Sequence, residues 1–267
     1  MRKEITSPQN SYIKELTQLK DKSRLRKKTN TFLIEGFREI SLAILGKYHI
    51  ETILVNTSII DEIAIQQLLN KASSTIDVIE ISKDVYKKLA LRASTEGILA
   101  VANSKNLSLN NIKFTNKNPL ILVAEAPEKP GNIGALLRTA DAAGIDAVLI
   151  ANPKTDIYNP NIIRSSIGSV FTTTIGTGTT SEIITFLKEN NIAIYGAALT
   201  ASVEYQTIDY THASAIVVGT EATGLSNEWL QNTTQNIIIP MQGAIDSMNV
   251  SVSAAIVVFE AVRQRIF

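Results

Sequence analysis

From Leu120 onward, short apolar runs alternate with segments of helical periodicity, and this alternation constrains the fold more than any other feature of the chain. The runs are rich in β-branched residues and have no polar face, which indicates strands covered on both faces. Strands are predicted at 120–124, 147–150, 171–175, 192–195 and 216–218, and helices at 133–143, 160–167 and 182–189. The second half of the chain is therefore expected to be an α/β domain, with a mostly parallel sheet and helices on both of its faces.

A last strand and helix complete this pattern near the end of the chain. The run 237–239 is predicted to be a buried strand that Pro240 stops. Ser247 and Asn249 occupy capping positions, and the helix that follows consists largely of Ser, Ala and Val as far as Phe259. Side chains this small let backbones approach closely, so we expect the helix to pack tightly against another element or another subunit.

The first half of the chain alternates in the same way but over a shorter length. Strands are predicted at 32–34, 50–55, 76–81 and 98–101, with helices at 37–45, 60–69 and 85–91 between them. This pattern predicts a smaller α/β sandwich. A polar segment at 104–118 separates the halves, so we expect one domain at 1–110 and another at 111–267.

Charge is distributed unevenly between the two halves. Residues 1–110 hold 17 Lys and Arg against 12 Asp and Glu, whereas residues 111–267 hold 9 against 13. The basic excess is greatest in the first thirty residues, which suggests an anionic partner such as RNA. The alternative is a solvated helix face. The candidate phosphate contacts are Arg24, Arg26, Lys27, Lys28, Arg38 and Arg164.

Several classes of site are excluded by composition. The chain has no cysteine and only two histidines, so thiolate zinc sites, cysteine nucleophiles and histidine-based metal sites are not expected. No apolar run reaches the length of a membrane span, and the N-terminus lacks an apolar signal core, so a cytoplasmic protein is expected. No Gly-x-Gly-x-x-Gly follows a strand, and the segment 176–180 lacks the Lys of a phosphate-binding loop, so it is interpreted as a plain turn.

Three stretches place glycines and polar side chains directly after predicted strands, where open α/β sheets bind ligands. They are Asn132-x-Gly134-x-x-x-Arg138, Gly219-x-Glu221-x-x-Gly224 and Ile239-Pro-Met-x-Gly243-x-x-x-Ser247-x-Asn249. In this order and spacing they resemble the signature motifs of the SpoU-type, or TrmH-like, RNA ribose 2′-O-methyltransferases of the SPOUT class. Residues 1–110 also resemble the substrate-binding domain of members that act on large-subunit ribosomal RNA, through Gln9-Asn10, the basic run and 32–38.

The resemblance implies a trefoil knot near the C-terminus, S-adenosylmethionine as cofactor and a homodimer formed through the C-terminal domain. It implies catalytic or geometry-holding roles for Asn132, Arg138, Glu221, Ser247 and Asn249, and cofactor contacts by Gly219, Thr220, Gly224, Ile239 and Met248. For Arg138, a fixed cation is chemically easier than a general base, because its pKa lies above about 12. For Glu221 and Asn249, hydrogen bonds within a turn or a cap are an alternative to substrate contact.

The activity that the resemblance implies is methylation of a ribose 2′-hydroxyl in RNA, with 23S ribosomal RNA as the expected substrate. Two alternatives remain open at this point. One is a transfer-RNA 2′-O-methyltransferase, which would share the catalytic domain. The other is an inactive knotted protein that binds RNA or assists assembly.

Overall fold

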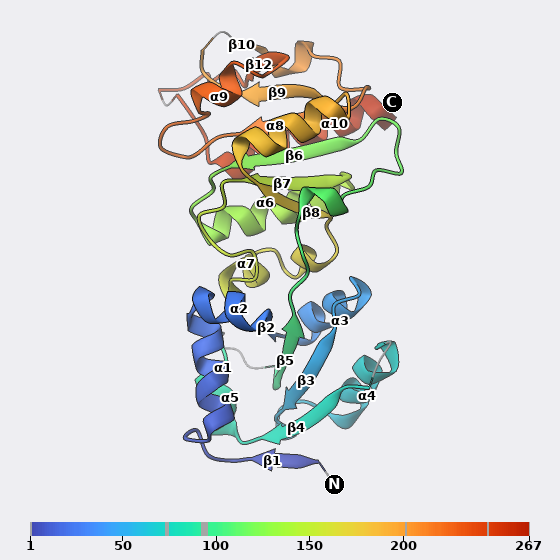
Figure 1. Ribbon diagram of the computed structural model, residues 1–267, viewed down its shortest axis with the longest axis vertical. Helices are drawn as coiled ribbons and strands as arrows, with labels where there is room; N and C mark the ends of the chain where they lie inside the picture. Colours follow the sequence, from blue (N-terminus) through green and yellow to red (C-terminus); the bar gives the residue numbers. More distant parts are fainter. Residues whose placement is uncertain (1, 73–74, 92–95, 201, 245, 267) are drawn as a thin grey trace. The chain divides into compact units, whose positions relative to one another are not determined.

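The computed structural model of the chain describes residues 2–72, 75–91, 96–200, 202–244 and 246–266 (Figure 1). The chain divides into two compact units. Unit 1 comprises Met1–Lys105 and Asp156–Thr172, and unit 2 comprises Asn106–Thr155 and Thr173–Phe267. The units differ from the expected domains 1–110 and 111–267 in two respects. The first stretch of unit 1 ends at Lys105, and a segment from the second half of the chain, Asp156–Thr172, also belongs to unit 1.

Unit 1 is built on a five-stranded mixed sheet in the order β1-β4-β3-β5-β2. β3 pairs parallel with β4 and antiparallel with β5. The strands are β1 (Lys3–Ile5), β2 (Thr31–Glu35), β3 (Ile50–Val55), β4 (Asp77–Ile81) and β5 (Ile98–Asn103). The sequence pattern predicts all of these except β1, because three residues are too few to show alternation.

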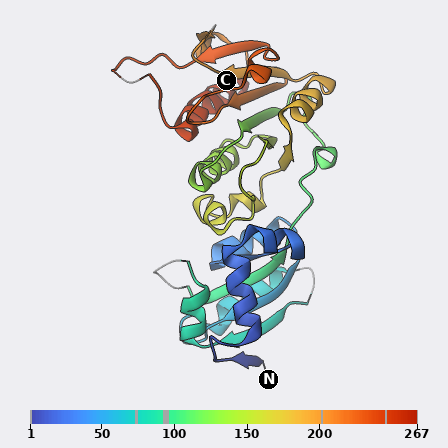
Figure 2. The same cartoon turned by 60° about the vertical axis from the view of Figure 1, so that its left-hand side comes forward.

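Helices cover both faces of this sheet (Figure 2). They are α1 (Ser11–Asp21), α2 (Ser23–Thr29), α3 (Phe37–Leu45), α4 (Glu62–Lys71) and α5 (Lys83–Leu89). α1 and α5 share one core with the sheet, in which Ile13, Leu16 and Tyr86 are buried. Polar side chains begin three of the helices: Asn10, Asp61 and Ser82 each accept a hydrogen bond from a backbone amide in the first turn.

The segment Asp156–Thr172 completes unit 1. It contains the short helix α7 (Pro160–Ser165) and the 3₁₀ helix η2 (Ser169–Phe171). The ring of Phe32 stacks on that of Tyr158, with centroids 4.4 Å apart, and on that of Phe171 at 5.9 Å. Arg26 forms a buried ion pair with Asp156, with 2.6 Å between Nε and Oδ2. Aromatic packing and a buried charge pair therefore hold this segment to the first 105 residues.

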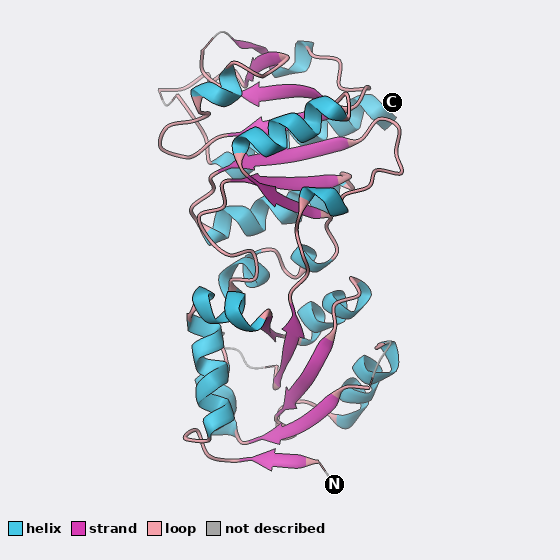
Figure 3. Ribbon diagram, viewed as in Figure 1, coloured by secondary structure: helices cyan, strands magenta, loops and turns pink. Residues whose placement is uncertain are grey.

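Unit 2 contains a seven-stranded sheet in the order β10-β12-β9-β11-β6-β7-β8. Every neighbouring pair in it is parallel, which confirms the predicted parallel α/β architecture (Figure 3). The strands are β6 (Leu120–Glu125), β7 (Ala147–Ala151), β8 (Ile175–Gly178), β9 (Ala193–Ala197), β10 (Ser202–Glu204), β11 (Ser214–Val218) and β12 (Gln235–Ile238).

Two sequence predictions about this sheet are wrong. Of the expected strand 171–175, only Ile175 lies in a strand, as the first residue of β8. Residues 171–174 are the end of η2 and a short turn, because Gly168 at φ 84° starts a tight turn and the Ser169 hydroxyl donates to the Ser166 carbonyl at 3.0 Å. The segment 176–180, expected to be a plain turn, forms most of β8 and the start of the next helix. Val170 and Phe171 are apolar because they are buried in unit 1 and not because they form a strand.

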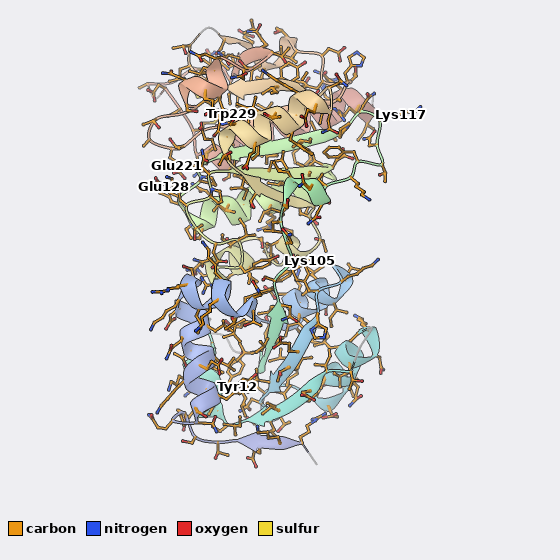
Figure 4. The ribbon with its side chains drawn as sticks, in the orientation of Figure 1. Tyr12, Lys105, Lys117, Glu128, Glu221 and Trp229 are labelled. Atoms are coloured by element: carbon orange, nitrogen blue, oxygen red, sulfur yellow. The ribbon has the colours of Figure 1, made fainter. Side chains whose placement is uncertain are left out.

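Helices also cover both faces of the unit 2 sheet. They are α6 (Pro130–Ala143), α8 (Thr180–Glu189), α9 (Asn227–Leu230) and α10 (Val250–Ile266). α6 and α10 contact each other, and α8 and α9 do likewise. The α8 and α9 face contains the core with Ile183, Leu187 and the fully buried Trp229 (Figure 4). α10 continues seven residues beyond the predicted end at Phe259, through a last turn with Arg263 and Arg265.

The polar segment expected to be an inter-domain linker is largely fixed to unit 2. Leu107 O accepts a hydrogen bond from Thr177 N at 2.8 Å. Leu109, Ile112 and Phe114 pack against the unit 2 core, and Leu109–Asn111 forms the 3₁₀ helix η1. A further 3₁₀ helix, η3, spans Tyr205–Thr207. None of the helices in the described residues is long and apolar enough to cross a membrane.

Candidate functional site

The three motifs follow the carboxyl ends of three parallel strands, β6, β11 and β12. β6 and β11 are neighbours in the sheet, with Ala124 paired to Val218 at their ends. Parallel strands end at the same edge of a sheet, and this edge is where such folds bind ligands. Glu221, labelled in Figure 4, lies at the edge toward which the strand arrows of unit 2 point in Figure 3.

Asn132, Glu221 and Asn249 form one hydrogen-bonded cluster at this edge. Asn132 Nδ2 donates to Glu221 Oε1, and Asn249 Nδ2 donates to Asn132 Oδ1 at 3.3 Å. Glu221 is 89 residues and Asn249 is 117 residues from Asn132 along the chain. Three of the five residues expected to be catalytic are therefore brought together by folding, with the Asn132 amide between the other two.

Asn249 also caps helix α10. Its Oδ1 accepts hydrogen bonds from Ser251 N at 2.9 Å and Ser251 Oγ at 2.6 Å, while its backbone carbonyl accepts from Val252 N and Ser253 N. The two interpretations made from the sequence, a cap and a site residue, are thus compatible. The Asn249 Oδ1 accepts the hydrogen bonds that cap α10, and its Nδ2 donates the hydrogen bond to Asn132 in the cluster.

Arg138 and Ser247 lie outside this cluster. Arg138 is exposed on α6 and has no hydrogen-bond or ion-pair partner among the described residues. α6 begins at Pro130, three residues before the expected start at residue 133, because proline is suited to the first helical position. Ser247 is exposed, and its hydroxyl donates to the neighbouring Asp246 at 3.1 Å.

The loop after β11 is a tight turn closed by its own backbone. Thr220 N donates to Gly224 O at 3.0 Å, and Gly224 N donates to Thr220 O at 3.1 Å. Gly224 has φ 68°, and a Cβ at Gly219 would collide with the Gly224 backbone. A glycine is therefore required at position 219 because the backbone of Gly224 packs directly against it. The motif shows that a glycine is present but not this reason for it.

Glu125 is a site-supporting residue that sequence reasoning missed. It is the last residue of β6 and is 5% exposed. Its Oε2 accepts from Ser226 N at 2.8 Å, and its Oε1 accepts from Thr180 Oγ1 at 3.4 Å. This carboxylate holds the end of the loop that carries Glu221. A charged residue directly after the apolar run 120–124 is the signal that could have found it.

The loop after β12 offers unpaired backbone groups. Of the residues from 241 to 248, those that the structure describes make no backbone hydrogen bond. Ile239 and Met248 are half-buried beside them. A loop with free amides and carbonyls between apolar side chains matches the chemistry of an adenosine-containing ligand, which presents polar edges on a flat apolar ring.

The candidate phosphate contacts do not all remain accessible. Arg24, Lys27, Lys28, Arg38 and Arg164 are exposed. Arg26 is buried, and besides its ion pair with Asp156 it donates to the carbonyls of Leu19 and Lys20, both at 2.8 Å. Its expected role in RNA binding is corrected, because a buried guanidinium with these partners supports unit 1 internally.

The chain belongs to the SpoU rRNA Methylase family, whose model matches residues 119–259 and so covers the parallel sheet of unit 2 and all three motifs. Residues 10–100 match a second family model, the MRM3-like substrate binding domain. The two matches fall on the two halves that the sequence pattern separates.

Similar proteins cover nearly the whole chain. The chain is 32% identical over 257 residues to the 23S rRNA (guanosine(2553)-2′-O)-methyltransferase RlmP of Bacillus subtilis (strain 168), spanning 96% of this chain and 98% of the relative. A crystal structure of an RNA 2′-O ribose methyltransferase is 38% identical, with a TM-score of 0.85 over 99% of this chain and 100% of that one. An AdoMet-bound rRNA methyltransferase from Sinorhizobium meliloti is 25% identical, with a TM-score of 0.91 over 99% of each chain.

Proposed function

We propose that the protein transfers a methyl group from S-adenosylmethionine to a ribose 2′-hydroxyl of 23S ribosomal RNA. The observation that carries the proposal is the Asn132–Glu221–Asn249 cluster at the strand ends of a SpoU-family domain. The names of similar proteins favour ribosomal over transfer RNA as the substrate. Such a substrate is consistent with a cytoplasmic location, which we include in the proposal.

The residues of unit 2 fit S-adenosylmethionine. Its sulfonium supplies an electrophilic methyl group. The backbone groups of Met241–Ala244 and Asp246–Met248, which make no backbone hydrogen bond among the described residues, would hold the polar edge of the adenine, and Ile239 and Met248 would enclose its ring. Gly219, Thr220 and Gly224 would shape the wall opposite, because their turn is fixed by reciprocal backbone hydrogen bonds.

The polar cluster would orient the nucleotide. Glu221 is an acceptor held in place by Asn132, so its carboxylate can position a ribose hydroxyl without reorganising. Asn249 fixes the amide of Asn132 in turn. The exposed Arg138 would act as a fixed cation that grips the adjacent phosphate and stabilises the oxygen that loses its proton. Ser247 would contribute a hydroxyl from the neighbouring loop.

We assign RNA binding to unit 1, with Arg24, Lys27, Lys28, Arg38 and Arg164 as phosphate contacts. All five are exposed, and the matching family model is a substrate-binding domain. Each contact should add about one unit to the slope of log affinity against log salt.

A trefoil knot in unit 2 and a homodimer complete the proposal. Three large apolar side chains of α10, Val252, Phe259 and Ile266, are 48, 47 and 67% exposed and recur every seven residues, so they lie on one side of the helix. A second copy would cover them. The second copy would also bring its own Arg138 to the site. This would supply the cation that the cluster needs, because the Arg138 of the same chain lies outside the cluster.

Light scattering of the full chain tests the dimer and should give twice the monomer mass of 29.1 kDa. A monomer at micromolar concentration contradicts the dimer.

One experiment tests the reaction. The purified chain is incubated with methyl-labelled S-adenosylmethionine and, separately, with deproteinised 23S ribosomal RNA and total transfer RNA. Label should enter the 23S RNA at a ribose 2′-oxygen of one nucleotide. Label in transfer RNA alone would change the substrate, and cofactor binding without transfer to either RNA would favour an inactive RNA-binding protein.

A further inference from the structure

The last turn of helix α10 is held to unit 2 by side-chain hydrogen bonds that the proposed chemistry does not use. Arg265 donates to three backbone carbonyls: Nε to Tyr210 O at 2.8 Å, Nη1 to Asn118 O at 2.5 Å and Nη2 to His212 O at 2.6 Å. Gln264 Oε1 accepts from Tyr210 N at 2.9 Å. A planar guanidinium with three fixed acceptors holds the end of the helix in both position and orientation. These bonds are called the Arg265 clamp below.

The backbone that the clamp grips is firmly attached to the sheet. Asn118 lies two residues before β6, and His212 lies two residues before β11. Tyr210 is fully buried, and its ring packs edge-on against that of Tyr195 on β9, with centroids 5.2 Å apart. The clamp therefore joins α10 to the amino ends of two inner strands of the unit 2 sheet.

Helix α10 extends from this edge of the sheet to the edge that carries the polar cluster. Its 17 residues give a length of about 25 Å, and the six residues of β6 span about 20 Å. Figure 4 labels Glu221 at one edge of the sheet and Lys117, the residue before Asn118, at the other. At the cluster edge, Asn249 Nδ2 donates to Asn132 Oδ1. One helix is thus tied by hydrogen bonds at both of its ends.

The packing between these two ends offers little resistance to sliding along the helix axis. The buried residues of α10 are Ala254, Val257, Val258 and Ala261. Ridges of longer side chains lock a helix into the grooves of its neighbour, and alanine forms no such ridge. The Asn249–Asn132 hydrogen bond is 3.3 Å long, at the far end of the normal range, so a small displacement of α10 breaks it.

We propose that Arg265 is a positioning residue for the site. Its clamp sets the position of α10 along the helix axis and so keeps Asn249 within hydrogen-bonding distance of Asn132. The inference rests on the proposed function, because this hydrogen bond belongs to the cluster that would orient the nucleotide. It extends the set of residues on which methylation depends to the opposite edge of the sheet.

The test weakens the clamp without removing its charge. Arg265→Lys replaces the planar fork by one ammonium group, which cannot reach three carbonyls in the same geometry. Arg263→Lys is the matched control, because Arg263 lies in the same turn, is exposed and donates to Glu260 of its own helix. Gln264→Met, which removes the neighbouring part of the clamp, replaces Arg265→Lys if that variant does not fold. Light scattering and thermal unfolding verify the mass and the folded fraction of each full-length variant.

Single-turnover methylation of a 23S ribosomal RNA transcript, at saturating S-adenosylmethionine, measures the effect. Arg265→Lys should slow it about tenfold, as expected for a small misplacement of an orienting group. Arg263→Lys should stay within about twofold of the wild type. Asn249→Asp removes the same hydrogen bond directly, so Arg265→Lys combined with Asn249→Asp should be no slower than the slower single variant.

A role in stability alone gives a different result. In that case Arg265→Lys lowers the thermal midpoint but leaves the rate of the folded chain within about twofold of the wild type, or its effect multiplies with that of Asn249→Asp to about a hundredfold. Either result overturns the inference in an active chain.

A readout that does not need activity separates this inference from the proposed function. The side-chain amide of Asn132 is followed by NMR in the full chain labelled with ¹⁵N-asparagine, and its signal is assigned with Asn132→Asp. Arg265→Lys should shift the signal as Asn249→Asp does, and Arg263→Lys should not. A wild type that methylates no RNA, with this shift, removes the function and leaves the positioning role. A wild type that methylates 23S RNA, with multiplicative rates and an unmoved signal, leaves the function and removes the positioning role.

Discussion

At the scale of single residues, the site depends on which hydrogen-bonding groups the Asn132 amide presents. Its Nδ2 donates to a carboxylate while its Oδ1 accepts from another amide, so no other side chain of this length serves both neighbours. Aspartate has the same shape but cannot donate when ionised. Exchanging the donor and the acceptor between positions 132 and 221 therefore tests directly whether the Asn132–Glu221 hydrogen bond matters for activity.

Asn132→Asp should lower single-turnover methylation at least about tenfold, since a charge-assisted hydrogen bond worth about 1.5–3 kcal/mol becomes a repulsion between carboxylates. Adding Glu221→Gln should restore part of the loss, because the amide introduced at position 221 can donate to the carboxylate introduced at position 132, to which Asn249 still donates. Glu221→Gln alone is the control. If the double variant is as impaired as the product of the two single effects, the hydrogen bond does not matter for activity.

For Arg138, the choice between fixed cation and general base can be tested by pH. Arg138→Lys keeps the charge but loses the planar fork, so activity should fall without vanishing, while Arg138→Ala should lose about 10²–10³-fold. Cofactor affinity should stay nearly constant in both. Lys deprotonates more easily than Arg, so a general base would give the Lys variant full alkaline rescue between pH 7 and 10. Single-turnover rates across this range decide the role.

The motif residues could be predicted from the sequence, whereas the residues that support them could not. Asn132, Glu221 and Asn249 can be recognised from the sequence because each lies at a fixed spacing from the other residues of its own motif, and the three motifs follow one another in a fixed order. Glu125 and Arg26 have no such spacing: their partners are 101 and 130 residues away, and only the folded chain defines them. Arg26 also shows why a run of basic residues misleads, because one member can turn inward while its neighbours stay exposed.

At the scale of elements, helix α10 and the site are coupled through Asn249. Asn249→Asp keeps an oxygen for Ser251 N but removes the donor to Asn132, so stability should be retained and activity should fall about tenfold. Asn249→Ala removes both and should also cost about 1 kcal/mol of stability. Thermal unfolding and methylation are measured side by side. If the Asp variant were as active as the wild type, Asn249 would have only a capping role and no role in the activity.

Strands were predictable where burial on both faces produced continuous apolar runs, as in β6, β7 and β11. The short edge strands β1 and β10 lack this signal, since β10 has two exposed residues of three. Phe171, the last residue of η2, gave the opposite error, a predicted strand residue outside any strand, because a buried 3₁₀ turn and a buried strand share the same composition.

At the scale of the whole molecule, the buried Arg26–Asp156 pair joins parts of unit 1 that are distant in the sequence. Removing one partner leaves an unpaired buried charge, so Arg26→Met should destabilise unit 1 by about 3–5 kcal/mol. Arg26→Met combined with Asp156→Asn should recover part of this loss. Urea unfolding followed by circular dichroism measures the change. The fluorescence of the single tryptophan, Trp229, which lies in the unit 2 core, reports the unfolding of unit 2 in the same samples and serves as the reference. An unchanged midpoint in Arg26→Met contradicts a structural role for the pair.

The discontinuous composition of unit 1 also affects how the protein is made. Its first 105 residues emerge from the ribosome before the segment Asp156–Thr172 does. At ~5–20 residues per second, the delay is roughly 3 to 13 s. During this interval Phe32 lacks both of its stacking partners, Tyr158 and Phe171, and Arg26 lacks its carboxylate. The nascent N-terminal sheet must therefore wait, with an aromatic surface uncovered, until the middle of the methyltransferase sequence has emerged.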